Sequence, residues 1–288
     1  MKRLSDFFRK NFVLITVLLL QIPLILPFFH KGFFPSHDDV QITRIFEMFQ
    51  SLKYGDFPPR WSANLLFGYG YPLYIFYGSL SYLIGAFFAF VIPNFLIATK
   101  FVFILSFFIG PIGVYFLVKE WWGKLPALIA ATAFSYIPYR AVDVFVRGNL
   151  GEFFSFSLFP LVFFVNWKFL TAQQDDQKKW GIVFCLFLFF QEISHNISCF
   201  IFFFFLLVFN LFYLGFLVKE REECSKKMIY LSAILILSLF MSAFYFIPLL
   251  YETKFVLVGQ FRDSPYREYF LTVKKLWDFP WGWGGYTD

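Results

Sequence analysis

Residues 181–218 read GIVFCLFLFFQEISHNISCFIFFFFLLVFNLFYLGFLV, an apolar block that the polar run from Gln191 to Asn196 interrupts. The block is too long for one membrane helix of ~20 residues, so it predicts two helices that meet at a polar turn. The whole chain has the same character: of 288 residues, 59% are apolar, 15% are charged and 49 are phenylalanine. A soluble domain carries about 25% charged residues. The sequence therefore predicts an all-α polytopic membrane protein and excludes a soluble enzyme, a disordered chain and a collagen-like fibre.

Seven apolar stretches predict transmembrane helices: 12–29, 100–118, 125–146, 152–170, 180–195, 197–218 and 228–250. The segment 79–98 would be an eighth if it crossed the membrane. Its apolar core ends before Pro93, a length typical of an interfacial or re-entrant helix. With seven spans, basic residues gather on one side, at the N-terminus and in the loops after the second, fourth and sixth spans. The positive-inside rule assigns that side to the cytoplasm and favours seven spans over eight.

This topology predicts a multi-pass cell-membrane protein with a cytoplasmic N-terminus and the bilayer as its partner. The net charge of +6 is then explained by cytoplasmic loops, and no nucleic-acid partner is predicted. The sequence specifies no oligomeric state. The predicted organisation is a transmembrane module over 1–250, with an outer loop at 30–78, followed by an extracytoplasmic tail over 251–288 that begins a further region. The outer loop, the turns 140–152 and 192–198 and the tail all fall on the outer face.

The outer loop carries two acids ahead of a predicted helix. Apolar residues recur there at helical spacing: Ile42, Ile45, Phe46, Phe49 and Leu52. This pattern predicts an amphipathic helix on the membrane surface. In a structural interpretation, Ser36 is its N-cap and Asp39 completes a capping box. In a functional one, Asp38 or Asp39 is a general base that acts on an acceptor hydroxyl.

Further polar groups follow in the same outer segments. Arg60 would contact a phosphate beside an aromatic loop that runs to Tyr77, unless these aromatics form only an interfacial belt. Arg140 and Asp143 can pair on one helix face. Arg147 would be a phosphate ligand and Glu152 its orienter or a second acid, unless the turn merely balances its charges.

The polar turn around His195 offers a proton shuttle or a hydrogen bond to substrate, unless its residues only cap helix ends. Glu192 is an ionisable group at membrane depth and therefore a functional candidate. His37, His195 and an acid could hold a divalent ion, but no ligand spacing supports this, and no metal or cofactor is predicted.

Several of these motifs occur together in a known family. Pro35-Ser-His-Asp38, the helix that carries Arg44, Gly55-x-Phe-Pro-Pro-Arg-Trp61 and Gly68-Tyr-Gly-Tyr-Pro72 resemble the first outer loop of the 6-pyruvoyl-tetrahydropterin-synthase-related membrane domain family. Arg147-Gly-Asn-Leu-Gly-Glu152 and Ser194-His-Asn196 resemble its later landmarks. That family is similar in turn to the GT-C integral-membrane glycosyltransferases, which use polyprenyl-phosphate-linked sugars as donors.

The resemblance implies a GT-C-like fold and a sugar transfer from a polyprenyl-phosphate donor to an extracytoplasmic hydroxyl. It assigns the base to Asp38, with Asp39 as the fallback. The implied substrate-binding residues are His37, Arg44, Arg60, Trp61, Arg147, Glu152 and His195. Two other functions stay open. A lipid-linked-sugar transporter would need charges midway along its spans and internal repeats, which the sequence lacks. A non-catalytic scaffold with a degenerate GT-C fold predicts that Asp38 and Asp39 can both be replaced.

Overall fold

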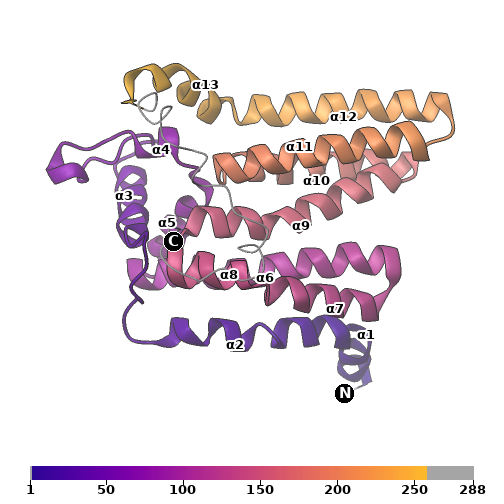
Figure 1. Ribbon diagram of the computed structural model, residues 1–288, viewed down its shortest axis with the longest axis horizontal. Coiled ribbons are helices and arrows are strands. Elements are labelled where there is room, and N and C mark those ends of the chain that lie inside the picture. Colours follow the sequence, from indigo (N-terminus) through magenta and orange to yellow (C-terminus); the bar gives the residue numbers. More distant parts are fainter. Residues whose placement is uncertain (1, 258–288) are drawn as a thin grey trace, which may run out of the picture.

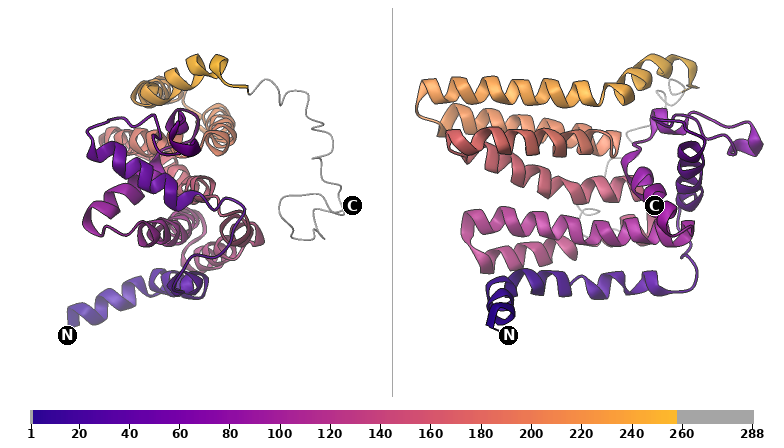
Figure 2. Two further views of the ribbon diagram at one scale, coloured as in Figure 1. Left: turned by 90° about the vertical axis from the view of Figure 1, so that its left-hand side faces the viewer. Right: turned by 180° about the vertical axis from the view of Figure 1, so that it is seen from behind.

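The structure, a computed structural model, describes residues 2–257. Over these residues it forms helices, apart from an isolated antiparallel bridge between Ser62 and Tyr71. The long helices run side by side (Figures 1 and 2). An all-helical chain is thus confirmed, whereas the predicted tail lies outside the described residues from 258 onward.

The long helices are α1 (Lys2–Leu19), α6 (Phe95–Trp122), α7 (Lys124–Ser135), α9 (Leu150–Thr171), α10 (Gln174–Glu192), α11 (Asn196–Phe212) and α12 (Arg221–Met241). Short helices and turns lie between or extend them: α2 (Ile22–Ile25), η1 (Leu26–Phe29), α3 (Gln41–Lys53), η2 (Leu66–Gly68), α4 (Leu73–Phe76), α5 (Leu80–Val91), α8 (Pro138–Val142), η3 (Asp143–Arg147), η4 (Tyr213–Leu217), α13 (Ala243–Glu252) and η5 (Thr253–Phe255).

Within the described residues, 5 helical segments are long and apolar enough to cross a membrane: Asn11–Phe29, Phe95–Trp122, Leu150–Thr171, Asn196–Leu217 and Arg221–Met241. The predicted span 125–146 is wrong as one helix, because α7 ends at Ser135 and α8 begins at Pro138. A proline disfavours the α-helical conformation of the residue before it. Pro138 therefore accounts for the break at Ile137. The predicted span 228–250 is likewise divided, at Ser242 between α12 and α13, and α10 ends at Glu192, before the end of the predicted span 180–195.

The segment 30–94, which includes α3, α4 and α5, connects η1 to α6 at one end of the molecule. Its two borders are tied together, because Lys100 Nζ donates a hydrogen bond to the carbonyl of His30 at 2.6 Å. In Figure 1, α3, α4, α5 and α13 all lie at this end. We call it the loop end. It also holds the connections 136–149 and 193–195, whereas the connections 172–173 and 218–220 lie at the opposite end with the N-terminus. Which end faces the cytoplasm stays a prediction from the positive-inside rule.

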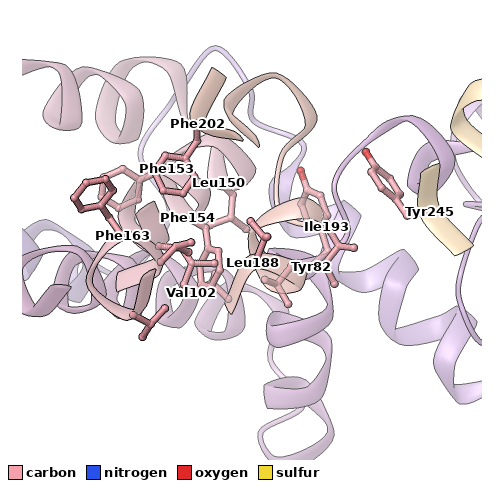
Figure 3. Close-up of a cluster of buried hydrophobic side chains, with 14 of the residues drawn as sticks. Tyr82, Val102, Leu150, Phe153, Phe154, Phe163, Leu188, Ile193, Phe202 and Tyr245 are labelled. Atoms are coloured by element: carbon pink, nitrogen blue, oxygen red, sulfur yellow. The ribbon is translucent and has the colours of Figure 1, made fainter. Parts of the chain in front are cut away.

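Phenylalanine and small residues build the core between the long helices. Phe103 and Phe153 are fully buried, and Figure 3 shows Phe153, Phe154 and Leu150 of α9 beside Val102 of α6. Gly113 lets α6 approach α9 closely, since a Cβ there would lie 2.5 Å from the amide nitrogen of Leu161. Such small residues are typical of helix contacts in membranes.

Helix α3 crosses the ends of the long helices at the loop end (Figures 1 and 2). Its buried side chains include Arg44, Ile45 and Met48. Ile45 packs so tightly on α5 that a Cβ at Gly85 would lie 2.5 Å from Ile45 Cδ1. The amphipathic helix predicted from the apolar spacing is therefore present, and it holds the outer loop against the bundle.

Candidate functional site

The chain ahead of α3 is fixed by a contact across the fold. The predicted capping box is wrong, because α3 begins at Gln41 with Val40 as its N-cap residue. Ser36 is instead buried against Gly148. The amide of His37 donates to the carbonyl of Val146 at 2.9 Å, and that of Asp38 donates to the carbonyl of Arg147 at 2.7 Å. These two backbone bonds place Asp38 and Arg147 side by side, although the residues are far apart in sequence.

Gly148 makes this pairing possible in two ways. Its φ is +68°, in the left-handed region that glycine tolerates. A Cβ at Gly148 would also overlap the hydroxyl of Ser36 and lie 2.7 Å from its Cβ. The glycine therefore serves both the turn and the docking of the outer loop.

We expect Gly148→Ala to lower the free energy of unfolding more than Gly55→Ala does. Gly55 also has a positive φ, +88°, but a Cβ there meets nothing within 4 Å. The left-handed conformation alone costs about 1–2 kcal/mol for a non-glycine residue, and the Gly148 variant adds the overlap with Ser36. Thermal unfolding of the two purified variants in detergent measures the difference. Equal melting temperatures would show that the contact with Ser36 contributes nothing.

Asp38 is partly open to solvent and held by α3. Its side chain is 33% exposed, and its Oδ2 lies 3.9 Å from Arg44 Nη1. Gln41 Nε2 donates to the same oxygen at 3.4 Å. Asp39 is exposed beside it. The structure thus separates the two acids, since Asp38 belongs to a network of polar side chains and Asp39 faces outward.

Arg44 is buried, and its guanidinium contacts other side chains of the protein. Its Nη1 donates to the hydroxyl of Tyr82 at 3.1 Å, and its guanidinium lies 4.6 Å from the ring centroid of Tyr77. The Tyr82 hydroxyl donates in turn to Gln41 Oε1 at 3.0 Å. This bond orients the Gln41 amide with its nitrogen toward Asp38. Arg44, Tyr82 and Gln41 therefore position the Asp38 carboxylate.

Arg147 joins a second polar cluster beside Asp38. Its Nη1 lies 2.9 Å from Glu152 Oε1, 3.0 Å from the Tyr139 hydroxyl and 3.5 Å from Asp143 Oδ1. The Tyr139 hydroxyl also donates to Glu152 Oε1. Because these contacts all use Nη1 and the side chain is 38% exposed, ligand oxygens can still approach the guanidinium. Glu152 pairs with Arg147, an arrangement that fits both the functional interpretation and the charge-balanced turn.

Asn149 fixes Glu152 at the start of α9. Its side-chain oxygen accepts from the Glu152 amide at 3.2 Å, and its Nδ2 donates to Glu152 Oε2 at 3.1 Å. Asn149 is thus the N-cap of α9, a role for which asparagine is favoured.

The predicted pair of Arg140 with Asp143 is wrong. Arg140 is fully buried and donates to Ser157 Oγ at 3.0 Å and to the carbonyl of Ser106 at 3.3 Å. Phe134 and Phe153 flank its guanidinium. Asp143 pairs with Arg147 instead, because the two residues lie one turn apart in the π-helical segment η3.

Asp143 is a buried acid whose oxygens make no hydrogen bond to the described residues. Burial raises the pKa of this carboxyl well above its usual range, and the neighbouring Glu152 acts in the same direction. Arg147 opposes the rise. Burial therefore favours the protonated form of Asp143 more than that of an exposed aspartate.

The turn 193–195 is a third segment at this place, next to the chain ahead of α3 and the turn 136–149. The amide of Leu80 donates to the carbonyl of Ile193 at 3.1 Å, and Asn196 Nδ2 donates to the carbonyl of Phe76 at 2.9 Å. A Cβ at Gly151 would lie 3.6 Å from His195 Cδ2. The outer loop, the turn 136–149 and the turn 193–195 therefore meet at the loop end.

His195 is the N-cap of α11, which is the structural role that the sequence left open. Its Nδ1 accepts from the amide of Ser198 at 3.4 Å and lies 2.9 Å from Ser198 Oγ. Burial lowers the pKa of the imidazole below its ordinary value of 6.5, although Glu152 acts in the opposite direction. The neutral ring is thus the form that the fold stabilises.

We expect the stability that neutral His195 supplies to be complete above pH 6.5 and to be lost as the pH falls through the lower folded-state pKa. Thermal unfolding of His195→Asn, which keeps a side-chain acceptor for the cap, should therefore show a weaker decline between pH 7 and pH 5 than the wild type. His30→Asn, the same substitution at an exposed histidine, is the control. Parallel profiles for wild type and His195→Asn would refute the linkage.

Other predicted residues lie apart from this cluster. Glu192 accepts hydrogen bonds from Ser238 at 2.9 Å and from Ser242 at 2.7 Å, so it joins α10 to α12. Arg60 is exposed and borders cavities along α13. Trp61 packs over Gly70. The contacts described for Arg60 and Trp61 do not involve Asp38 or Arg147.

We define the Asp38–Arg147 site as Asp38 and Arg147 with the side chains that position them. The sequence did not single out Gln41, Tyr82 or Tyr139 for this site. Tyr82 lies in the apolar segment 79–98 and Tyr139 in the predicted span 125–146, where hydropathy marks neither residue as part of a site. His37 is exposed next to Asp38. Between residues 2 and 257, no group of three or more histidine, cysteine, aspartate or glutamate side chains is placed to hold a metal ion.

Comparison with known proteins identifies the family. A family model described as the 6-pyruvoyl-tetrahydropterin synthase related domain, a membrane protein, matches residues 74–259, which is more than half of the chain. No curated protein and no solved structure matches the chain significantly. The matched region includes Arg147, Glu152 and His195, and it begins after Asp38. The chain is therefore a membrane protein that belongs to the 6-pyruvoyl-tetrahydropterin synthase related family.

Proposed function

We propose that this protein is a membrane glycosyltransferase that moves a sugar from a polyprenyl phosphate to an acceptor hydroxyl on the extracytoplasmic side. One observation carries the proposal: at the loop end of the helices, the amide of Asp38 donates a hydrogen bond to the carbonyl of Arg147. The backbone thus joins a residue with a partly exposed carboxylate to one with a partly exposed guanidinium. A base and a cation in this arrangement suit a displacement whose leaving group is a phosphate. The resemblance to GT-C enzymes supports the same reading.

The reaction is a single displacement. Asp38 accepts the proton of the acceptor hydroxyl while the hydroxyl oxygen attacks the anomeric carbon of the sugar. The bond from that carbon to the phosphate oxygen breaks, and the polyprenyl phosphate leaves with the electron pair. General-base help of this kind contributes ~10²–10⁴-fold to the rate. Arg147 balances the charge that develops on the phosphate.

The remaining site residues support these two groups. Arg44 is buried and positions Asp38, so we assign it no direct contact with substrate. Glu152 holds Arg147 in place. His37 and His195 are assigned hydrogen bonds to the hydroxyls of the sugar. Arg60, beside α13, and the neighbouring Trp61 are assigned to the phosphate or the lipid of the donor.

The test uses the full chain reconstituted in vesicles with radiolabelled polyprenyl-phosphate sugars and, separately, nucleotide sugars. We expect transfer from a lipid donor and none from a nucleotide sugar. Arg147→Gln should lower kcat/KM for the lipid donor roughly 10–100-fold, the value of a lost hydrogen bond to a charged group. Arg221→Gln, an exposed arginine at the opposite end, is the matched control and should leave transfer unchanged.

Two outcomes would contradict the proposal. Movement of intact lipid-linked sugar across the vesicle membrane, without transfer, would identify a transporter. Neither transfer nor movement with any donor would favour the non-catalytic scaffold.

A further inference from the structure

Two cavities meet at Gln177, at the end of the helices opposite the loop end. One has a volume of about 280 Å³ and an almost wholly apolar lining, between α10 and α12. The other has a volume of about 250 Å³ and a polar lining, where the connections 172–173 and 218–220 come together. Gln177 borders both cavities, so the two are neighbours, and we call the pair the groove, with an apolar and a polar part.

The apolar part has the depth of one bilayer leaflet. Along α10 it extends from Gln177 to Cys185, which corresponds to ~12 Å of helix rise. The hydrocarbon core of a bilayer is ~30 Å thick. Ile182 and Leu237 line the groove and are 64% and 51% exposed, so it opens toward the lipid. An acyl chain from the leaflet at this end matches its chemistry and its depth.

A buried amide without a partner lies where the two parts join. Gln177 is 6% exposed, and its Nε2 makes no hydrogen bond to the described residues. Buried N–H groups are nearly always paired, and an exception indicates a missing partner. The phosphate or ester oxygens of a lipid, seated where its acyl chain begins, are acceptors of the required kind.

The charged side chains of the groove indicate a headgroup that carries one positive and one negative group. In the polar part, Glu222 pairs with Lys226 at 2.7 Å and Glu223 pairs with Lys227 at 2.6 Å. Over residues 2–257, Glu220 in the polar part and Lys178 beside the apolar part form no ion pair. An acid and a base are thus left without partners on the two sides of Gln177.

We infer that this groove binds one phospholipid whose headgroup carries both a phosphate and a primary ammonium, such as phosphatidylethanolamine. Lys178 and the Gln177 amide bind the phosphate, Glu220 binds the ammonium, and one acyl chain lies between α10 and α12. A lipid that carries only a phosphate leaves Glu220 without a partner and meets the glutamates of the polar part. The inference is independent of the proposed transfer reaction, because the groove lies at the other end of the molecule.

The experiment is native mass spectrometry of the full chain, released from detergent that contains equal amounts of phosphatidylethanolamine, phosphatidylglycerol and phosphatidylcholine with the same acyl chains. We expect one phosphatidylethanolamine to stay bound, in roughly tenfold preference to phosphatidylglycerol, as for one charge-assisted contact. Phosphatidylcholine should be disfavoured as well, since its ammonium has no N–H to donate.

Three variants locate the lipid. Glu220→Gln should abolish the preference for the ammonium headgroup, and Lys178→Gln should weaken retention of all three lipids. Gly181→Leu should fill the apolar part, since a Cβ there already lies 3.3 Å from Ile234 Cδ1. Gly215→Leu is the matched control on α11's extension, where a Cβ meets nothing within 4 Å.

Retention of all lipids alike, unchanged in Glu220→Gln and in Gly181→Leu, would overturn the inference and show bulk lipid only. Retention of phosphatidylglycerol in place of phosphatidylethanolamine would overturn the assignment of the headgroup. Glu220 is exposed, so its variant tests the proposal even if Gly181→Leu fails to fold.

Discussion

Asp38→Asn is expected to reduce sugar transfer about 10²–10⁴-fold, the value of a general base. The amide has nearly the shape of the carboxylate but cannot accept the proton of the acceptor hydroxyl. Its surroundings should change little, because the side chain is 33% exposed and its nearest cation is 3.9 Å away. We therefore expect the loss in kcat with a nearly unchanged melting temperature. The measurement is a rate assay with a polyprenyl-phosphate sugar, alongside thermal unfolding.

Two matched variants make this result specific. Asp39→Asn makes the same chemical change one residue away, on an exposed side chain. Asp175→Asn makes it at the opposite end of the helices and should leave transfer unchanged. A large loss in Asp39→Asn together with an active Asp38→Asn would move the base to Asp39. Full activity in both variants would show that neither aspartate acts as a general base.

Gly78→Ala is expected to destabilise the folded protein by about 3 kcal/mol or more, the upper range for overpacking. A Cβ on Gly78 would overlap the carbonyl group of Ser194 and lie 2.7 Å from the amide nitrogen of His195. Both partners are backbone, so no side-chain rotation relieves the overlap. The outer loop would have to leave the turn 193–195, and the hydrogen bond from Leu80 to Ile193 would break with it.

Thermal unfolding in detergent and the yield of folded protein measure this effect. Gly32→Ala is the control, since it lies in the same loop and a Cβ there has its nearest neighbour, His30 Nδ1, at 4.0 Å. A Gly78→Ala protein that melts with the wild type would contradict the close packing of these two segments.

Local patterns in the sequence were sufficient to predict most of the helices. The spacing of Ile42, Ile45 and Phe49 correctly predicted α3, because a helix needs only its own apolar stripe to be recognised. The polar run from Gln191 to Asn196 correctly predicted the turn between α10 and α11. The break at Pro138 was missed, since apolar residues continue past the proline and hydropathy alone does not register it.

The site was less predictable because long-range contacts override its local signals. Ser36 has the right residue type and position for an N-cap, yet it packs on Gly148, more than a hundred residues later. Arg140 lies three residues from Asp143, yet Ser157 and Ser106 on other helices take its hydrogen bonds. Neither contact could be read from residue spacing, because the partners are far apart in sequence and only the packing of the helices brings them together.

The contact between the outer loop and the turn 193–195 also sets an order for biogenesis. Asn196 donates to the carbonyl of Phe76 across 120 residues of sequence. A ribosome that adds 5–20 residues per second needs roughly 6–24 s to make that interval. Throughout this time the loop lacks the partner that Asn196 provides. The loop is therefore fixed to the turn 193–195 only after the residues of the Asp38–Arg147 site have been made, and a chaperone or translocase component that shields residues 74–80 would act in that interval.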